Sequence, residues 1–406
     1  MRFTIDDLTY LESVFGRFYD VGAEVSGGVS RLGYSPAEDE MHGMFRQLGT
    51  ELGAEPYTDE AGNSFLKISP EEPYVLIGSH LDSVLEGGRY DGVAGILTGL
   101  LILRWAKLEN RNIPVRVAAF RCEESSGFGV STIGSGLVTG KKDGRKIEGF
   151  SGSGGETLGE VFSRKGYSIT PGIIQGVKEY MELHIEQGRV LEENKDEIGI
   201  VSVIAGPRRF SLYIEGLAEH SGATPMPLRR DALCGAAELI LEIEKAGLEE
   251  SDKNSVSTVG IIHSRPNVLN VIPGRVQLQV DIRGIEKESL DYMEEKIKKS
   301  AKDICRRRSL TYYKEPINAS EPVSLDGDVL DKLGRYARAE GIRYRRMISG
   351  AGHDAMNFVD IARSSLVFVP CKNGISHNKN EFAELEDICR GAYLFYRYIC
   401  GEYAAE

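Results

Sequence analysis

The amino-acid sequence predicts an α/β fold in which an open sheet is interrupted by a smaller α+β domain. Short apolar runs at 75–77 and 115–120 have the composition of strands buried on both faces, and helical segments alternate with them. Between about 208 and 322 the pattern changes to strands in which apolar and polar residues alternate, and to two amphipathic helices. A chain of 406 residues can hold two domains, each with its own core.

The first part of the open sheet is assigned to residues 1–208. Helices are predicted at 5–19, at 37–52 and from Val93 onward, strands are predicted at 75–77 and 115–120, and the segment 179–193 is expected at a further strand end. Polar residues follow these strands. In an open α/β sheet, functional residues gather at the carboxyl ends of the strands, so we expect the chemistry there.

The inserted α+β domain is assigned to residues 209–322. Strands are predicted at 210–214, 256–262 and 276–283, and helices at 230–246 and 290–306. The helices are expected to cover one face of the sheet. The first domain then resumes in residues 323–406, with a helix at 330–340, a strand at 365–369 and a closing helix at 385–398.

The overall charge argues against two classes of partner. The net charge is −12, so neither nucleic acid nor an anionic membrane is attracted to the chain. The amino-terminal segment MRFTIDDLTY has two aspartates where a signal peptide needs an apolar core. The six cysteines show no CxxC spacing, which is typical of free thiols in a reducing compartment. We therefore expect a cytoplasmic protein that binds neither nucleic acid nor membranes.

The stretch from Tyr74 to Leu103 carries the first chemical motif. His80 and Asp82 follow the strand, and residues two apart in extended chain face the same way, so Asp82 can hold the ring of His80 while the other imidazole nitrogen points at a metal ion. Asp91 stands at or near the start of the next helix. Histidines at strand ends and aspartates at helix starts are also common without any function, so these residues gain meaning only from the rest of the chain.

Other side chains that can bind metal recur along the chain. The candidates share imidazole or carboxylate chemistry and are His80, Asp91, Glu124, His184 and His377. Such mixed ligation suits Zn²⁺, Mn²⁺, Co²⁺ or Ni²⁺ better than Mg²⁺ or Ca²⁺. A shared carboxylate lets two ions lie about 3.5–4 Å apart, and Asp91 is the natural bridge. Taken alone, the pair Glu123-Glu124 would indicate only two solvated loop acids.

The chain resembles a known family over nearly its whole length. The similarity lies in a series of motifs in the same order, namely SHLDSVLEGGRYDGVAG, EES, ELHIEQGRVLE, EHSGATPMPLRRDA, NVIPG, SGAGHDAM and ISHNKNE. They resemble the amidase/hydantoinase-carbamoylase branch of the M20 metallopeptidase superfamily, which contains N-carbamoyl-L-amino acid hydrolases, allantoate amidohydrolases, ureidoglycolate amidohydrolases and β-ureidopropionases. HIEQG and GAGHDA distinguish this branch from the peptidases and aminoacylases of the superfamily.

The resemblance implies a catalytic domain with two divalent metal ions and an inserted lid domain that also forms a homodimer. One ion would be held by His80, Asp91 and His184, and the other by Asp91, Glu124 and His377. Zn²⁺ or Mn²⁺ is expected, with Co²⁺ or Ni²⁺ as alternatives. Glu123 would be the general base, because a carboxylate next to a ligand can take a proton from water and pass it to the departing nitrogen. Asp82 would support this catalysis by holding His80.

The resemblance also implies contacts with the substrate. These are assigned to Gln187, His220, Asn270, Arg283, Gly352 and His353. Arg283 suits a carboxylate, because guanidinium offers two parallel donors, although on an alternating strand it could equally form a cross-strand ion pair. His220 lies in the inserted domain, so it can act in catalysis only when the two domains close. In the family, lid residues of one subunit can complete the site of the other.

The expected activity is hydrolysis of the ureido C–N bond of N-carbamoyl-L-amino acids. Allantoate is the alternative substrate, followed by ureidoglycolate and β-ureidopropionate, since these compounds all present a ureido group and a carboxylate. An aminopeptidase or aminoacylase of the wider superfamily and a binding protein without catalysis remain as rival hypotheses. The five candidate ligands together with Glu123 argue against the binding protein, and the motif HIEQG with Asn270 and Arg283 argues against the peptidase.

Overall fold

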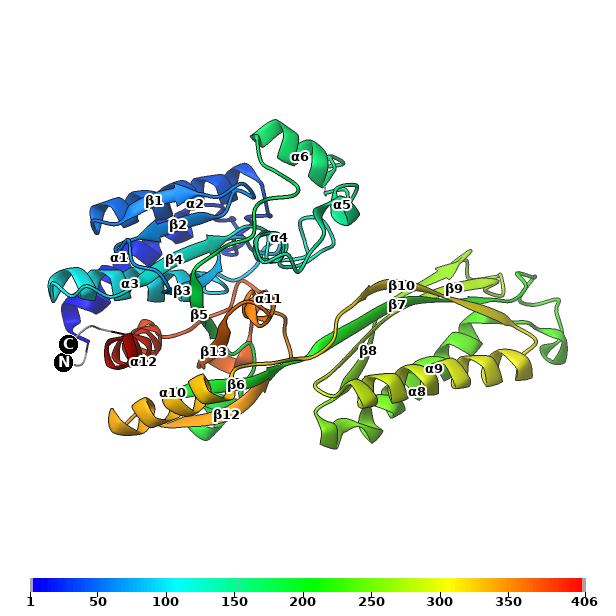
Figure 1. Cartoon of the computed structure of the whole chain (residues 1–406). Helices are drawn as coiled ribbons and strands as arrows, with labels where there is room; N and C mark the ends of the chain where they lie inside the picture. Colours follow the sequence, from blue (N-terminus) through cyan, green and yellow to red (C-terminus); the bar gives the residue numbers. More distant parts are fainter. Residues whose placement is uncertain (1–2, 153, 404–406) are drawn as a thin grey trace. The chain divides into compact units, whose positions relative to one another are not determined.

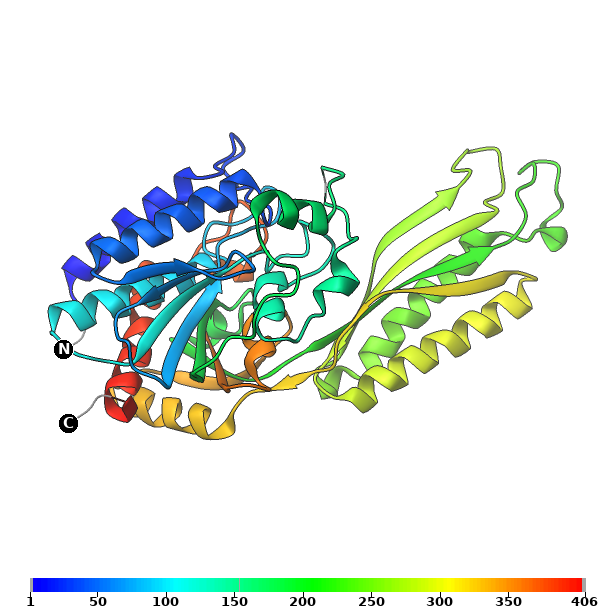
Figure 2. The ribbon, with the colours of Figure 1, turned by 45° about the horizontal axis from the view of Figure 1, so that its top comes forward.

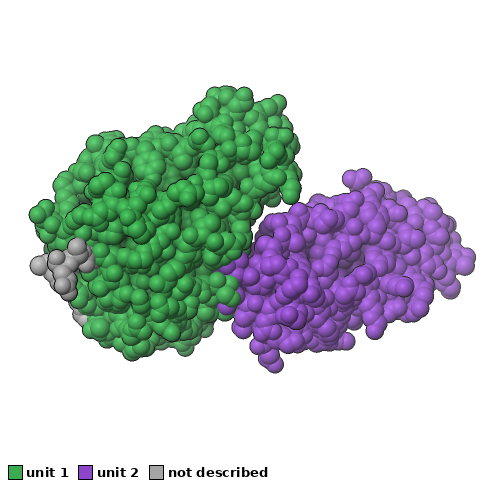
Figure 3. All heavy atoms as spheres, viewed as in Figure 1, with its two compact units in different colours: residues 1–202, 324–406 green, residues 203–323 purple. Residues whose placement is uncertain are grey.

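The structure is a computed structural model that describes residues 3–152 and 154–403. Met1 and Arg2, part of the segment in which no signal peptide was expected, lie outside these residues. The chain forms two compact units (Figure 3): unit 1 comprises Met1–Ser202 and Ser324–Glu406, and unit 2 comprises Val203–Val323. The sequence placed the inserted domain at 209–322, and its role as a lid and dimerisation domain stays a prediction. Among the described residues, no helix is long and apolar enough to cross a membrane.

Unit 1 is built on a nine-stranded mixed sheet (Figure 1). Its strands are β1 (Glu55–Thr58), β2 (Ser64–Lys67), β3 (Tyr74–His80), β4 (Val115–Phe120), β5 (Val177–Ile185), β6 (Ile198–Ile204), β11 (Val323–Ser324), β12 (Tyr344–Ser349) and β13 (Arg363–Val369). The order is β1-β2-β4-β3-β5-β13-β6-β11, with β12 paired to β6. The central strands β4, β3, β5 and β13 are parallel, whereas β2 and β6 join them antiparallel. The predicted open α/β sheet is confirmed.

The helices of unit 1 connect and cover these strands. They are α1 (Ile5–Asp20), α2 (Pro36–Glu51), α3 (Val93–Leu108), α4 (Ile133–Val138), α5 (Gly144–Ile147), α6 (Leu158–Lys165), α7 (Val190–Asn194), α10 (Gly327–Ala339), α11 (Ala355–Phe358) and α12 (Leu385–Tyr403). Helix α3 contacts α1, α12 and the strands β3, β4 and β5, and nearly all of its residues are buried. Every residue of β3 and β4 is buried as well, as expected for parallel strands covered on both faces.

Unit 2 is a four-stranded antiparallel sheet with two helices against one face (Figure 2). The sheet order is β10-β7-β9-β8, from β7 (Gly206–Glu215), β8 (Val256–Arg265), β9 (Arg275–Gly284) and β10 (Thr311–Ala319). The helices are α8 (Ala232–Glu249), which begins after the capping residue Asp231, and α9 (Lys287–Arg307). Alternate residues of β7 and β9 pack against these helices to form the core, which confirms the predicted α+β architecture. The sequence did not predict β10.

Candidate metal centre

The predicted metal ligands converge at one edge of the sheet of unit 1. His80 is the last residue of β3, and His184 lies near the end of β5. Glu124 follows the end of β4, and Asp91 precedes α3. Because β3, β4 and β5 are parallel, their carboxyl ends meet at the same edge, and His377 joins them from the loop after β13.

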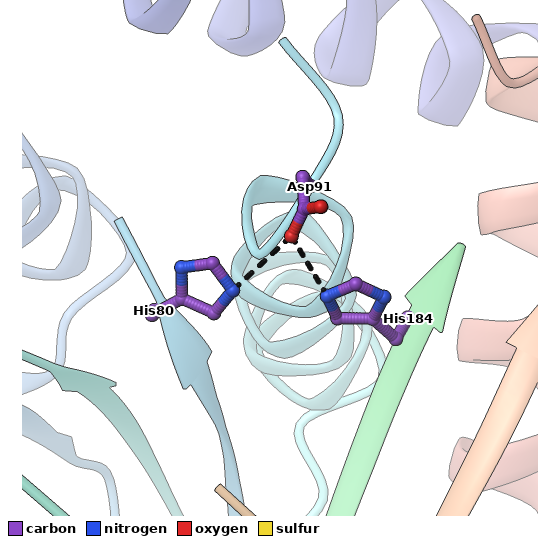
Figure 4. A group of neighbouring side chains, drawn as sticks. All are labelled: His80, Asp91 and His184. Atoms are coloured by element: carbon purple, nitrogen blue, oxygen red, sulfur yellow. Dashed lines mark ion pairs between the residues drawn. The ribbon is translucent and has the colours of Figure 1, made fainter. Parts of the chain in front are cut away.

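The first group of ligands consists of His80, Asp91 and His184 (Figure 4). Nε2 of His80 lies 3.3 Å from Oδ1 of Asp91, and Nε2 of His184 lies 3.0 Å from the same oxygen. The other ring nitrogens are held from behind: Nδ1 of His80 is 3.3 Å from Oδ1 of Asp82, and Nδ1 of His184 is 2.9 Å from the carbonyl oxygen of Ile185. Both imidazoles therefore direct Nε2 at one carboxylate oxygen, as the sequence predicted for His80.

The second group uses the other oxygen of the same aspartate. Oδ2 of Asp91 lies 3.3 Å from Nε2 of His377, which lies 3.0 Å from Oε1 of Glu124. In each group the possible ligand atoms all lie within 4.8 Å of one another. Each group thus combines imidazole and carboxylate donors around a small space, and Asp91 offers one oxygen to each. This donor set fits two divalent ions that share one carboxylate.

The charges of this cluster depend on one another. Burial by itself would lower the pKa of His80, but hydrogen bonds to Asp82 and Asp91 outweigh it and raise the pKa well above its usual value. Burial would likewise raise the pKa of Asp91, but the neighbouring charge of His184 and hydrogen bonds from the three histidines hold it well below its usual value. Protons on the imidazoles and divalent metal ions therefore compete for the same positions beside Asp91.

Close packing around Asp91 depends on a glycine. Gly92 precedes α3 with a φ of 67°, a conformation that favours glycine. A Cβ atom at this position would lie 2.6 Å from the ring of His80. The segment that carries Asp91 can therefore approach the end of β3 only because Gly92 has no side chain.

Glu123 lies beside the first group. Its side chain is buried, and Oε2 is 4.0 Å from Nε2 of His80. Burial raises the pKa of Glu123 well above its usual value; His80 opposes this shift, and the negative charge of Glu124 adds to it. A raised pKa makes the ionised carboxylate a stronger base. Glu123 is thus a neighbour of the first group, and its role as a general base stays a prediction.

The loop that carries Glu123 and Glu124 is fixed by buried carboxylates. The backbone N–H groups of Glu123 and Glu124 donate to Oδ1 and Oδ2 of Asp82, each at 3.0 Å. The preceding N–H, that of Cys122, donates to Oε1 of Glu38 at 2.8 Å. Sequence analysis missed Glu38, because an acid in the first turn of a helix gives no sign that it reaches a strand end far along the chain.

Two further predicted residues lie beside the metal groups. Gln187 donates from Nε2 to Oδ2 of Asp91 at 2.8 Å, and its Oε1 is buried without a hydrogen-bond partner among the described residues. The ring of His353 lies 4.6 Å from that of His184, and Nε2 of His353 is 2.9 Å from Oγ of Ser349. Burial holds the pKa of His353 well below its usual value, so this ring is neutral. Gly352 directly precedes it.

The remaining predicted residues belong to unit 2. Nδ1 of His220 accepts N–H groups of Gly222 and Ala223, and the carbonyl of Asn270 accepts the N–H of Ser221, so His220 and Asn270 are neighbours. Arg283 pairs with Asp281, two residues before it on the same strand, at 3.0 Å.

Arg283 lies far from His220 within unit 2. Arg283 is opposite Pro207 at the start of β7, whereas Glu215, at the other end of β7, is opposite Arg275. That length of strand corresponds to roughly 26 Å at about 3.3 Å per residue, and His220 lies beyond it. A small molecule therefore cannot contact Arg283 and His220 of one chain at the same time.

Comparison with known proteins gives consistent similarities over most of the chain. The family model of Peptidase family M20/M25/M40 matches residues 76–400. An N-carbamoyl-L-amino-acid amidohydrolase from Pseudomonas sp. (strain NS671) is 36% identical over 395 residues, which cover 94% of each chain. An allantoate amidohydrolase from Escherichia coli (strain K12) is 32% identical over 381 residues, which cover 91% of this chain and 92% of the relative.

A solved structure shows the same similarity in three dimensions. The crystal structure of an amidase of the hydantoinase/carbamoylase family from Burkholderia multivorans matches with a TM-score of 0.87 at 32% sequence identity, and the match covers 97% of both chains. The motifs quoted from the sequence all lie within the residues that the family model matches.

Proposed function

Because this chain belongs to Peptidase family M20/M25/M40, as its motifs led us to expect, we propose that it hydrolyses the ureido C–N bond of N-carbamoyl-L-amino acids. The similar amidohydrolases act on carbamoyl or ureido compounds, so the chain is a hydrolase of C–N bonds other than peptide bonds. Allantoate is the second candidate substrate, since the allantoate amidohydrolase is similar over nearly its whole length. The substrate in either case is a small ureido carboxylate.

The observation that carries this proposal is the division of Asp91 between two groups of ligands. We propose that His80, Asp91 and His184 hold one divalent ion and that Asp91, Glu124 and His377 hold the other, with Zn²⁺ or Mn²⁺ as the first choices. When bound, such ions polarise a carbonyl oxygen and lower the pKa of a water molecule. The residues around them then decide which molecule reacts.

Glu123 is proposed to move the proton. Its carboxylate takes a proton from the attacking water and delivers it to the departing nitrogen of the ureido group. Asp82 keeps Glu123 in place through the backbone and holds the ring of His80, so the base and one ligand share a single support. His353, which is neutral and buried, lies beside His184 and is proposed to contact the substrate together with Gly352.

Gln187 supports a ureido substrate rather than an N-acyl one. Because Asp91 can only accept hydrogen bonds, Gln187 must present its amide nitrogen to Asp91, and this leaves Oε1 as a buried acceptor without a donor. The terminal amino group of a ureido substrate is a donor that could pair with it. An acetyl group would place a methyl there and leave the acceptor unpaired, at a cost of about 1–3 kcal/mol.

Unit 2 is proposed to contribute to substrate binding and to form a homodimer. Arg283 would bind the carboxylate of the substrate, and His220 with Asn270 would contact the ureido carbonyl. Since Arg283 and His220 are too far apart to contact one small molecule, we propose that they serve different sites of a dimer. Strand β8 lies at the edge of its sheet and exposes Ile261 and Ile262, which suits it for contact with a second copy.

A cytoplasmic location is also part of the proposal. All six cysteines are free thiols in the described part of the chain, and four of them are buried. Free thiols of this kind fit a reducing compartment.

The test is ammonia release from N-carbamoyl-L-amino acids and from allantoate, measured side by side after the protein is stripped of metal and reloaded with Mn²⁺ or Zn²⁺. Glu123→Gln should lower kcat by about 10²- to 10⁴-fold, because the amide cannot accept the proton. Glu12→Gln, which changes an exposed acid of α1, is the matched control and should leave kcat unchanged.

The pattern of substrates decides among the candidates. Turnover of allantoate alone would establish the second candidate. Turnover of dipeptides or N-acetyl amino acids instead would establish the peptidase or aminoacylase hypothesis. Absence of turnover of both ureido substrates by the metal-loaded protein would contradict the proposed function.

A further inference from the structure

Glu381 is a buried carboxylate that connects the two loops of the second metal group. It is 2% exposed and lies in the segment that follows His377. Its Oε1 accepts the N–H groups of Tyr90 and Asp91, at 2.8 and 3.0 Å. Its Oε2 accepts the hydroxyl of Ser376 at 2.9 Å. One side chain therefore binds the backbone at the bridging aspartate and the residue next to His377.

Ser376 extends this connection to the carboxylate of Asp91 itself. Its Oγ lies 2.9 Å from Oδ2 of Asp91 as well as 2.9 Å from Oε2 of Glu381. Both carboxylates can only accept, so the single hydroxyl proton of Ser376 is shared between them. The oxygen that Asp91 directs at His377 is thus fixed by the same small network that holds the loop.

The chain is shaped to admit the carboxylate of Glu381 at this place. A Cβ atom on Gly88 would lie 2.0–2.2 Å from the carboxylate atoms of Glu381, which is closer than any real contact. An alanine at position 88 would therefore push the carboxylate away from Tyr90 and Asp91. Gly88 has an ordinary negative φ, so the alanine itself fits the backbone there.

The two metal groups depend on this network to different degrees. In the first group, the ligands other than Asp91 are His80 and His184, which lie on the buried strands β3 and β5. In the second group, His377 lies on a loop with a φ of 54°, and its side chain is 47% exposed. The loop ligand needs an external support that the strand ligands already have.

We propose that Glu381 is a positioning residue that fixes Asp91 and the loop of His377 relative to each other, so that it maintains the second metal group selectively. This inference rests on the proposed two-metal site. Loss of a side chain that holds a metal ligand in place typically lowers the metal affinity 10- to 100-fold.

The test is calorimetric titration of metal-free protein with Mn²⁺, a measurement independent of activity. The wild-type protein should bind two equivalents. Glu381→Ala should bind the second equivalent about 10- to 100-fold more weakly and the first unchanged. Gly88→Ala should show the same selective loss although it keeps the charge of Glu381. Glu381→Gln should stay close to wild type, because its amide oxygen can accept both N–H groups while its amide nitrogen donates to Ser376.

The control is Glu386→Ala, which removes an exposed carboxylate of α12 nearby and should leave both equivalents unchanged. Thermal unfolding of each metal-free variant checks folding, and Gly88→Ala carries the test if Glu381→Ala does not fold. Two equivalents with wild-type affinity in the folded variants, or equal weakening of both equivalents, would overturn the role of Glu381 while the proposed function stands. A wild-type protein that binds fewer than two equivalents would overturn the two-metal site itself.

Discussion

Asp82 shows how a single buried carboxylate can organise several parts of the site. It touches the ring of His80 and accepts the backbone N–H groups of both Glu123 and Glu124. The spacing of His80 and Asp82 predicted the first contact. The other contacts have no signal in the sequence, because any residue supplies a backbone N–H and only the fold decides which one meets the carboxylate.

Replacement of Asp82 by asparagine should disturb the loop of Glu123 without creating a cavity at position 82. Asparagine keeps the shape but presents an NH₂ group to one of the two N–H donors, which leaves a buried donor unpaired at a cost of about 1–3 kcal/mol. We expect kcat/KM for the ureido substrate to fall about 10- to 100-fold. Steady-state kinetics at saturating metal measures this, with Asp6→Asn, an exposed residue of α1, as the control. Wild-type kcat/KM in Asp82→Asn would contradict the role of Asp82.

The residues that sequence analysis missed at this site share one property. Glu38 and Glu381 act on backbone groups far away in the chain, with Cys122 and Asp91 as their respective partners. Metal ligands can be predicted from residue type and from their place at strand ends. Carboxylates that hold backbone N–H groups follow no spacing, so only the folded chain reveals them.

Among the elements, the buried strands β3 and β4 were predicted, whereas the edge strand β10 was missed. The apolar runs of β3 and β4 have continuous burial, which leaves a clear pattern in the sequence. β10 lies at the edge of the sheet of unit 2, and its register shifts between Pro316 and Asn318. Proline and charged residues are tolerated at an edge, where one side of the strand needs no partner, and they hide the strand pattern.

The packing of α2 against β2 buries a histidine that the site does not use. His42 is fully buried, its Nδ1 is 2.9 Å from Oγ of Ser64, and Nε2 has no hydrogen-bond partner within the described part of the chain. Burial holds the pKa of His42 well below its usual value, so the ring is neutral in the folded protein. This contact therefore makes the docking of α2 sensitive to acid.

Stability should fall as the pH drops below about 6.5, and His42→Asn should reduce this fall. The unfolded chain binds a proton at His42 near its usual pKa of about 6.5, whereas the folded chain does not, so the contribution of His42 is present above that pH and is lost below it. Below pH 6.5 the free energy of unfolding should fall more steeply with decreasing pH in the wild type than in the variant. The difference between the two slopes should approach about 1.4 kcal/mol per pH unit.

Urea unfolding between pH 8 and pH 5 measures this difference. The single tryptophan, Trp105, lies in α3 and reports unit 1. His263→Asn, at an exposed position of β8 in unit 2, is the control and should keep the wild-type slope of unit 1. Parallel pH profiles for wild type and His42→Asn would contradict the assignment.

At the scale of the whole molecule, loss of metal should lower the free energy of unfolding of unit 1 only. All five proposed ligands belong to unit 1, so an ion that binds there stabilises that unit alone. Free metal at 100 times its Kd should raise the free energy of unfolding by about 2.7 kcal/mol per site. The fluorescence of Trp105 during urea unfolding, with and without Mn²⁺, measures this gain. Asp91→Asn weakens both groups, so Mn²⁺ should raise its free energy of unfolding much less. An increase equal to that of the wild type would show that Mn²⁺ binds at another place.

The distance between Arg283 and His220 in unit 2 has a genetic consequence. If His220 serves the partner's site while Arg283 serves the site of its own chain, a chain with His220→Ala and a chain with Glu123→Gln, each inactive alone, should restore activity when they are produced in the same cell. One site of each mixed dimer would then be intact, which gives about one quarter of wild-type activity if chains pair at random. Two defective copies of one gene would thus complement each other.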